Sequence, residues 1–403
     1  MVSRMPRNSI RRNIARLAGA CLLSLVAVTA PLADTASFIS SLWPQAQAQG
    51  VSRPVFEAAF AGYSPSSEIM ALTRKQPEFA QTVADYIGKR VTPSQVQKGR
   101  EMQAKWSRTL DDIYARYGVQ GEVLLAIWGM ETNFGSFMGG NNTIHALATL
   151  TQNGYRAEYF RGELLTALRI LQEGHIGPRQ MVGSWAGAMG HTQFMPSSFM
   201  RYAVDYTGDG TKDIWNAVSD ALASSANYLR ANGWRPGETW GYEVQLPRGF
   251  DFARAETLDK LPISQWQKLG ITRTGGRAFP RPGDMARLYM PAGGDGPAFL
   301  VLPNFDVIKR YNNSNSYALA VGHLADRILG APDFATPWPA NDFALNASQR
   351  AEVQRLLVRR GYDAGSADGV IGPKTRAAIR AFQAAAGLTA DGHASGRLLR
   401  ALQ

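Results

Sequence analysis

The sequence contains little cysteine and little histidine, and these shortages exclude several kinds of chemistry. One cysteine in 403 residues cannot form an intramolecular disulfide, so the chain is not a disulfide scaffold. The five histidines are scattered, and the chain has no HExxH or CxxC motif, which argues against a zinc enzyme. With 45% hydrophobic and 19% charged residues, the composition is that of a globular protein and excludes a collagen-like or disordered chain.

Length and charge place loose limits on organisation and partners. A chain of this length is too long for one compact core and is expected to form two or three units. The formal net charge of +11 favours anionic partners in general. No nucleic-acid-binding motif accompanies that charge, and we expect no nucleic acid as a partner.

The beginning of the chain has the layout of an export signal. Residues 1–16 are basic, residues 17–28 form an apolar run too short to span a membrane, and small residues follow. Cys21 lies inside the apolar run and would be removed with it. We therefore predict a signal peptide over residues 1–33 and a periplasmic mature protein, with an uncleaved amphipathic anchor as the alternative.

The rest of the chain divides into a long, mainly helical unit and a short C-terminal unit. Helical periodicity dominates up to Asn232, and residues 315–329 return to it. Between them, at about 235–305, short alternating runs between glycine and proline clusters predict a small β-rich insertion. We thus predict a mainly α fold with a large domain at 34–330, a proline-containing linker at 331–345 and a compact helical unit at 346–403.

The C-terminal unit contains an internal repeat. Residues 368–379 align without gaps to residues 391–402, and each copy starts with Asp-Gly, which favours a turn. Through positions that include Leu356-Leu357, Asp368-Gly369 and Phe382-Gln383, the unit resembles the peptidoglycan-binding domain. The resemblance implies a three-helix fold that holds an enzyme on the cell wall. A helical bundle that serves another partner is the alternative.

One acid in the large domain is a candidate catalyst. If residues 123–135 are helical, Leu124, Ile127, Trp128 and Glu131 share one apolar face. A carboxyl on such a face is desolvated, so its pKa should rise, and an acid protonated near neutral pH can cleave a glycosidic bond. The alternative is a structural glutamate at a helix end, either solvated or paired with an arginine.

A second stretch, residues 184–198, is rich in small residues that let the backbone approach a ligand closely. Its Ser184 and Gln193 have groups that can hydrogen-bond sugar hydroxyl and acetamido groups. Taken alone, the stretch favours a tight helix–loop packing site instead.

Together the two stretches resemble the lytic murein transglycosylases of the B type. The similarity rests on W-G-M-E-T-N-F-G, on S-W-A-G-A-M-G-x-x-Q-F-M-P-S-S, on Asn227-Tyr228 and on residues 311–318. It implies a lysozyme-like helical core and cleavage of the β-1,4 bond between N-acetylmuramic acid and N-acetylglucosamine, with a 1,6-anhydro product. It also implies that Glu131 is the sole acid/base and that the glycan contacts are Ser184, Gln193, Tyr228, Tyr311, Tyr317 and Tyr86. For each tyrosine, core packing is the alternative.

A single carboxylate would determine the mechanism, because ordinary glycosidases use two. Glu131 would protonate the leaving oxygen and then act as a base on the 6-hydroxyl of the same sugar. That attack is intramolecular and so has a proximity advantage over water. The N-acetyl group or local dipoles would support the oxocarbenium-like state, and no cofactor is required.

Residues 205–213 resemble the start of a calcium loop. Oxygen-bearing side chains occupy positions 1, 3, 5 and 9, and Gly210 occupies position 6. Position 12 is Asn216 instead of the bidentate glutamate, so a metal-free Asp-Gly turn is the alternative. A bound calcium would be structural, with candidate ligands Asp205, Thr207, Asp209, Thr211, Asp213 and, in a longer loop, Asp220.

These features favour a secreted, wall-bound lytic transglycosylase that acts as a monomer on peptidoglycan glycan strands. Cell-wall synthesis or division machinery is a candidate partner. A muramidase that uses water is the nearest enzymatic alternative, and only product chemistry separates the two. A non-catalytic wall-binding protein is the alternative of another class, and the intact stretch around Glu131 argues against it.

Overall fold

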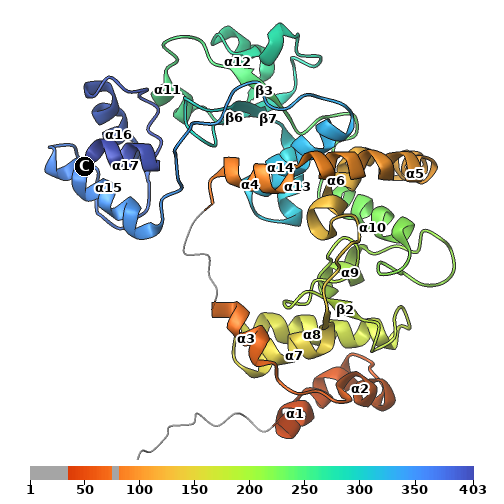
Figure 1. Ribbon diagram of the computed structural model, residues 1–403. Coiled ribbons are helices and arrows are strands. Elements are labelled where there is room, and N and C mark those ends of the chain that lie inside the picture. The colour runs from red at the N-terminus through yellow and green to blue at the C-terminus, as the bar shows by residue number, and fades with distance from the viewer. Residues whose placement is uncertain (1–34, 75–80) are drawn as a thin grey trace, which may run out of the picture.

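The computed structural model describes residues 35–74 and 81–403. The predicted signal peptide at 1–33, with Cys21, lies outside the described residues. Within them, helices predominate and strands are few and short, which confirms a mainly α fold with a small β-rich insertion (Figure 1). In these two ranges, no helix combines the length and the apolar character needed to cross a membrane.

The first of two helical clusters packs N-terminal helices against helices from the middle of the chain. It comprises α1 (Thr35–Ala48), α2 (Arg53–Phe60), α3 (Ser67–Arg74), α7 (Thr143–Gln152), α8 (Ala157–Gln172) and α9 (Pro196–Tyr202). In α1, Phe38, Leu42 and Ala46 recur every four residues and form one buried face. α7 starts after Asn142, whose side chain accepts a hydrogen bond from the backbone N–H of His145.

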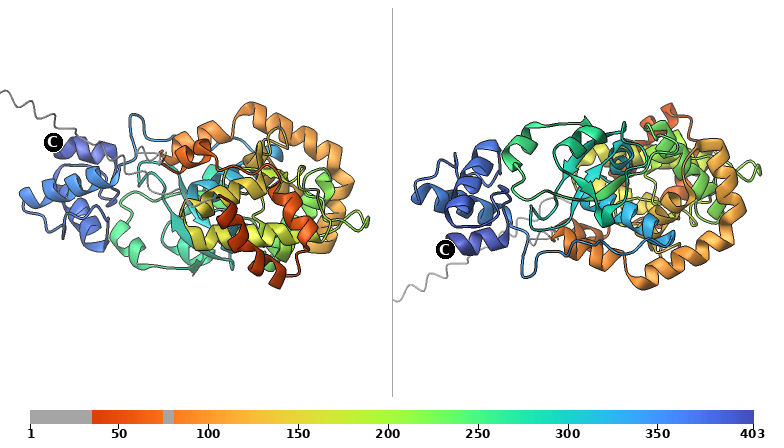
Figure 2. Two further views of the ribbon diagram at one scale, coloured as in Figure 1. Left: turned by 90° about the horizontal axis from the view of Figure 1, so that it is seen from below. Right: turned by 90° about the horizontal axis from the view of Figure 1, so that it is seen from above.

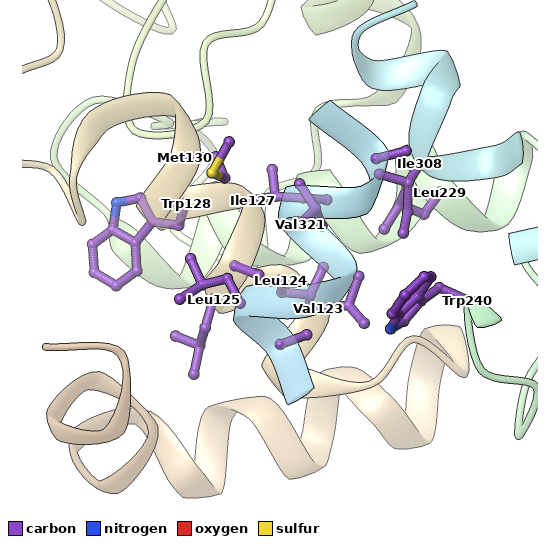
Figure 3. Packing of buried hydrophobic residues seen from close by; sticks show 14 of the residues in the cluster. Val123, Leu124, Leu125, Ile127, Trp128, Met130, Leu229, Trp240, Ile308 and Val321 are labelled. Atoms are coloured by element: carbon purple, nitrogen blue, oxygen red, sulfur yellow. The ribbon is translucent and has the colours of Figure 1, made fainter. Parts of the chain in front are cut away.

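The second cluster surrounds one apolar helix. It comprises α4 (Val83–Arg90), α5 (Pro93–Tyr117), α6 (Gly121–Thr132), α10 (Val218–Ala231), α13 (Pro303–Tyr311) and α14 (Asn315–Ile328). Residues 124–127 of α6 are all 0% exposed, so this helix is buried on every side rather than on one face. Leu229, Ile308 and Val321 of the neighbouring helices pack in the same cluster (Figure 3). The position of α6 is therefore fixed by packing around its whole circumference.

The insertion is an antiparallel sheet with short helical connections. Its strands are β3 (Gly241–Gln245), β4 (Leu261–Pro262), β5 (Thr272–Arg273), β6 (Met285–Tyr289) and β7 (Ala298–Val301), in the order β4-β6-β7-β3-β5. The connections include α11 (Phe252–Thr257), α12 (Ile263–Lys268) and the 3₁₀ turn η1 (Thr274–Gly276). Trp266 is fully buried beneath the sheet, and its Nε1 donates a hydrogen bond to the carbonyl of Ala286 at 2.9 Å. All of these elements fall inside the segment in which the sequence predicts a β-rich insertion.

Residues 331–345 contain neither helix nor strand, but contacts with the large domain hold them in place. The carboxylate of Glu243 on β3 accepts hydrogen bonds from the backbone N–H groups of residues 335–336, at 3.0 and 2.8 Å. The carboxylate of Asp333 contacts Nε2 of His323 at 2.9 Å and the guanidinium of Arg327 at 3.1 Å. This connection is therefore anchored along its first third.

The C-terminal unit consists of α15 (Ala347–Arg359), α16 (Pro373–Ala385) and α17 (Gly396–Leu402). The internal repeat has a structural counterpart in two glutamines. Gln354 accepts a hydrogen bond from the glycine N–H of the Asp368-Gly369 turn at 2.8 Å and donates to its aspartate at 3.1 Å. Gln383 makes the same pair of bonds with the Asp391-Gly392 turn, at 2.8 and 2.7 Å. Each turn is thereby tied to the helix that precedes it.

The C-terminal helices dock on the β-rich insertion. Glu256 of α11 pairs with both Arg376 and Arg380 of α16, the second at 2.6 Å. The carboxylate of Asp391 accepts a hydrogen bond from the backbone N–H of Gly294 at 2.7 Å. Both views of Figure 2 show α15–α17 at one end of the molecule, beside the insertion. Charged and polar contacts therefore join the two units in addition to the connecting chain.

Candidate active site

Glu131 lies in the last turn of α6. The helix is capped by Asn133 in the left-handed region (φ 50°), and Phe134 and Gly135 follow with φ of 55° and 75°, so the chain turns away directly after the acid. Burial raises the pKa of Glu131 to about 7, against the opposing effects of a hydrogen bond from Tyr317 and a nearby positive charge. The raised pKa expected for a carboxyl in this apolar helix is confirmed. Near neutral pH, Glu131 is therefore divided between its protonated and ionised forms.

Tyr317 is the direct partner of the acid. It lies in the first turn of α14, where its backbone N–H donates to Oγ of the capping residue Ser314 at 3.3 Å. Tyr317 Oη donates a hydrogen bond to Oε1 of Glu131 at 2.7 Å. Burial, reinforced by the charge of Glu131, raises the pKa of Tyr317 well above its ordinary value. The phenol therefore stays protonated and remains a donor.

Helix α4 brings a second tyrosine and a cation to the same region. Burial raises the pKa of Tyr86, and Glu131 contributes to the rise while Arg90 opposes it. The guanidinium of Arg90 lies 5.8 Å from the centre of the Tyr86 ring, and its charge lowers the pKa of Glu131. The sequence analysis missed Arg90, because nothing in a chain with many arginines indicates that this one faces the acid.

Three hydrogen bonds join residues 184–198, the stretch rich in small residues, to the end of α6 and to the chain that follows it. Thr132 Oγ1 donates to the carbonyl of His191 at 2.7 Å, and Trp128 Nε1 donates to Nδ1 of the same histidine at 3.2 Å. Gln193 Nε2 donates to the carbonyl of Met138 at 3.1 Å. The two stretches singled out in the sequence are therefore neighbours in space. The joining roles of Thr132 and His191 were missed, since only the fold brings these distant positions together.

Ser184 and Gln193 both stabilise the turn that separates them. Ser184 Oγ accepts hydrogen bonds from the backbone N–H groups of Ala186 and Ala188, at 3.3 and 3.0 Å. Gln193 has a φ of 54°, and its amide nitrogen also donates to the carbonyl of Gly190 at 2.9 Å. None of these bonds uses the hydroxyl hydrogen of Ser184 or the amide oxygen of Gln193. Both groups can form hydrogen bonds with a sugar.

The glycines of this region serve close packing within the protein. The two-residue strand β1 (Asn141–Asn142) follows α6 in the chain. It pairs with the two-residue strand β2 (Val182–Gly183) in antiparallel orientation. A Cβ on Gly139 would lie 2.0 Å from the carbonyl oxygen of Gly183, so no other residue fits there. A Cβ on Gly190 would likewise lie 2.5 Å from the carbonyl oxygen of Ile214. The sequence suggested that small residues here let the backbone approach a ligand. At these two glycines, the backbone instead approaches another segment of protein backbone.

Tyr228 and Tyr311 pack between the two helical clusters. Their ring centres are 5.0 Å apart, and each ring also contacts Phe194, at 5.8 and 5.9 Å. Tyr311 Oη donates to the carbonyl of Thr192 at 2.9 Å, and Tyr228 Oη donates to the carbonyl of Arg310. Both side chains therefore have a packing role, and both support the loop that carries Gln193.

A tyrosine and an arginine are the side chains that act on the pKa of Glu131. Within the described residues, no other carboxylate contributes to the pKa of Glu131, which burial, Tyr317 and Arg90 determine.

The acidic side chains of the predicted calcium loop bond to the backbone of the loop itself. In the described ranges, no three acidic, histidine or cysteine side chains lie close enough together to hold a metal ion. The carboxylate of Asp205 accepts hydrogen bonds from the backbone N–H groups of residues 208–210. Asp209 accepts from both the backbone N–H and the hydroxyl of Thr211.

Asp220, the candidate substitute for the glutamate of a calcium loop, bonds to the backbone of the same segment. It is 0% exposed, and its two oxygens accept hydrogen bonds from the backbone N–H groups of Tyr206, Thr207 and Asp213. Asp213 itself accepts from the backbone N–H groups of Trp215 and Asn216. These carboxylates thus organise the turn through its backbone. The calcium interpretation for Asp205, Thr207, Asp209, Thr211, Asp213 and Asp220 stays a prediction.

Two family models match the chain. One is described as the transglycosylase SLT domain and matches residues 34–326. The other is described as a putative peptidoglycan binding domain and matches residues 346–402.

Known proteins resemble the chain in sequence and in structure. Membrane-bound lytic murein transglycosylase B of Escherichia coli (strain K12) is 39% identical over 249 residues, which are 60% of this chain and 66% of that protein. SltB3 from Pseudomonas aeruginosa, solved in complex with NAG-anhNAM-pentapeptide, is 46% identical, with 91% of this chain and 99% of that chain covered and a TM-score of 0.84. The Escherichia coli lytic transglycosylase Slt35, solved in complex with calcium, is 33% identical, with 74% and 93% covered and a TM-score of 0.60.

Proposed function

The chain belongs to the transglycosylase SLT family, and we propose that it is a lytic transglycosylase with a 1,6-anhydro product. It would cleave the β-1,4 bond between N-acetylmuramic acid and N-acetylglucosamine in peptidoglycan. The observation that carries this proposal is Glu131, whose pKa of about 7 suits one carboxyl group to act as an acid and then as a base.

In the first step, protonated Glu131 gives its proton to the glycosidic oxygen as the bond from that oxygen to C1 breaks. Positive charge then develops on the muramic acid ring, and Glu131 is left ionised beside it. The hydrogen bond from Tyr317 to Oε1, at 2.7 Å, stabilises Glu131 in this ionised form. Tyr317 is thus a positioning residue for the acid and also adjusts its pKa.

In the second step, ionised Glu131 takes the proton of the 6-hydroxyl of the same sugar, and the freed oxygen bonds to C1. The ring closure is intramolecular, which gives it an entropic advantage over the attack of a water molecule. It also needs no second carboxylate. A structure of the relative SltB3 in complex with NAG-anhNAM-pentapeptide, a ligand with an anhydro sugar, supports this product.

We assign the glycan contacts to the surroundings of Glu131. Ser184 would donate its hydroxyl hydrogen and Gln193 would offer its amide oxygen, since their other polar atoms are occupied by the backbone. Tyr86 of α4 would contact the glycan beside Glu131, and Tyr228 and Tyr311 would support the loop that carries Gln193. Residues 34–330 would form the catalytic unit.

Residues 346–403 would hold the enzyme on its substrate, because a peptidoglycan-binding family model matches 346–402. The basic and apolar layout of residues 1–33 supports export, and we assign the protein to the periplasm.

The test is digestion of purified peptidoglycan by the full chain, with products identified by mass spectrometry. We expect anhydro-muropeptides from the parent and none from Glu131→Gln. Glu122→Gln is the matched control, because Glu122 lies on the same helix and burial also raises its pKa, but it stands at the opposite end of α6. This control should retain the activity of the parent.

Two outcomes would contradict the proposal. Products with reducing ends would identify a muramidase that uses water. Absence of products from the folded parent, with the protein still bound to the wall, would favour a non-catalytic wall-binding protein.

A further inference from the structure

The backbone of His191 connects the turn of the acid with the loop that carries Gln193, and the reaction described above gives this histidine no step. Its carbonyl accepts a hydrogen bond at 2.7 Å from Thr132, the residue after Glu131. Its backbone N–H donates to the carbonyl of Ile214 at 2.9 Å. Gln193 follows two positions later in the chain. His191 therefore joins the end of α6, the glycan-binding loop and the segment around Ile214.

The imidazole ring of His191 is half-buried and packs against α6 and the turn that follows it. Its plane stands at 88° to the ring of Trp128, with the two ring centres 5.4 Å apart. A Cβ on Gly135 would lie 2.5 Å from both Cε1 and Nδ1 of the imidazole, so a glycine is needed to leave room for the ring. The ring is thus confined with its Nδ1 edge against the helix of the acid.

The partner of the ring determines where its proton lies. Trp128 Nε1 can only donate a hydrogen bond, and it lies 3.2 Å from Nδ1 of His191. Nδ1 must therefore present a lone pair, which places the proton of the neutral ring on Nε2. A protonated ring has an N–H group on both nitrogens, so Nδ1–H would point at the indole N–H. Trp128 is 2% exposed, and its N–H would then lose its partner away from water.

One charge acts on the protonation of His191. Burial lowers the pKa of His191 below its ordinary value of about 6.5, and the charge of Asp213 opposes this shift. Within the described residues, no other charge contributes to that pKa, and the groups of α6 and of its following turn that contact the ring are uncharged. In the same ranges, histidine takes part in ion pairs only at His175 and His323, so Asp213 acts from a greater distance.

We propose that His191 is a positioning residue for the glycan-binding loop and that only its neutral form holds Gln193 in place beside Glu131. Protonation of Nδ1 would set two donors against each other and move the ring away from Trp128. The hydrogen bond from Thr132 to the His191 carbonyl would be lost with this movement, and the loop would separate from the turn of the acid. The inference rests on the proposed reaction and adds a residue that limits it on the acidic side.

The proposal predicts a pH profile of kcat/KM with two limbs. The alkaline limb, near pH 7, belongs to Glu131, which must be protonated. The acidic limb belongs to His191, which must be neutral, and it should lie below about pH 6.5. On this limb kcat/KM should fall about tenfold per pH unit, as for the binding of one proton.

The test compares pH profiles for the release of soluble muropeptides from peptidoglycan by the full chain. His191→Asn puts an amide oxygen near the place of Nδ1, where it can accept from Trp128 and does not titrate. We expect this variant to keep the alkaline limb and to lack the acidic one. His191→Leu leaves the indole N–H unpaired and should lower kcat/KM by about tenfold or more at the optimum of the parent, a loss that His191→Asn should avoid.

The matched control is His145→Asn. Burial also lowers the pKa of His145, but this histidine lies on α7 in the first helical cluster. The acidic limb of the control should therefore coincide with that of the parent.

A second measurement requires no activity. In the full chain carrying Glu131→Gln, without substrate, the indole N–H resonance of Trp128 should shift in NMR spectra at the pH of the acidic limb. The shift should disappear when His191→Asn is added, because the amide oxygen accepts the hydrogen bond at every pH.

A parent profile without an acidic limb would overturn the proposal, as would an unchanged acidic limb in His191→Asn or its loss in His145→Asn. A Trp128 indole resonance that does not respond to acid would overturn the role of the hydrogen bond. The NMR titration involves no products, so its failure is distinguishable from failure of the proposed reaction.

Discussion

Removal of the Tyr317 hydroxyl is expected to raise the pKa of Glu131. Its Oη donates to Oε1 of Glu131 at 2.7 Å, and a hydrogen bond to an ionised group contributes roughly 1.5–3 kcal/mol. Part of that contribution persists when Glu131 is protonated, because a neutral carboxyl group also accepts hydrogen bonds. Since one pKa unit corresponds to about 1.4 kcal/mol, Tyr317→Phe should raise the pKa of Glu131 by roughly one unit. The parent value of about 7 would become about 8.

The assay is the pH profile of kcat/KM for the release of soluble muropeptides. Because the free enzyme needs Glu131 protonated, the profile of the parent should fall above about pH 7. In Tyr317→Phe this alkaline limb should move upward by roughly one unit, while the maximal rate falls because ionised Glu131 has lost a donor. Tyr311→Phe is the control, because its hydroxyl bonds Thr192 and Ser225 instead, and the limb should stay in place. An unmoved or lowered limb in Tyr317→Phe would refute the reasoning.

Three further predictions follow from the same contacts. Glu131→Gln should raise the free energy of unfolding at pH 8 by up to about 3 kcal/mol but should not raise it at pH 4. The reason is that the raised pKa of Glu131 makes the parent protein lose stability as the pH rises from about 4.5 to about 7. Equal effects of the substitution in urea titrations at both pH values would contradict this. Millimolar calcium or a chelator should leave the melting temperature unchanged, because Asp220 already accepts three hydrogen bonds from backbone amides, and a calcium-dependent rise would support the metal interpretation instead. Glu256→Gln should loosen the docking of Arg376 and Arg380, seen as a larger radius of gyration in small-angle scattering, whereas an unchanged radius would show that the other contacts suffice.

The parts of the fold that follow local patterns could be predicted from the sequence. The alternation of residues 242–246 and the Gly/Pro clusters around residues 298–302 correctly indicated strands, and the internal repeat has a structural counterpart in two Asp-Gly pairs that each bond to a glutamine. The raised pKa of Glu131 could also be anticipated, since its helix is apolar over several turns. The sequence analysis assigned that helix one apolar face, whereas it is buried all round. Only the tertiary arrangement supplies the helices that cover its other sides.

The contacts around the acid depend on distant segments and could not be derived from spacing. Tyr317 was a candidate only through the family resemblance, and its bond to Glu131 spans 186 positions. Arg90 and Thr132 gave no signal, because a residue type does not reveal which partner the fold brings to it. The calcium loop stays a prediction for a related reason. A regular spacing of oxygens does not tell whether backbone amides already occupy them, as they do at Asp220.

The docking of the C-terminal helices on the insertion has a consequence for how a wall-bound enzyme would select its cleavage point. A binding unit on a free tether raises the local concentration of enzyme and lets the acid reach many bonds. Here the ion pairs of Glu256, the bond between Asp391 and Gly294 and the anchored Asp333 hold the unit in one orientation. The distance from the wall-binding surface to Glu131 is then a constant of the molecule. The protein would then cut only those strands that present a scissile bond at this fixed distance from the point of attachment.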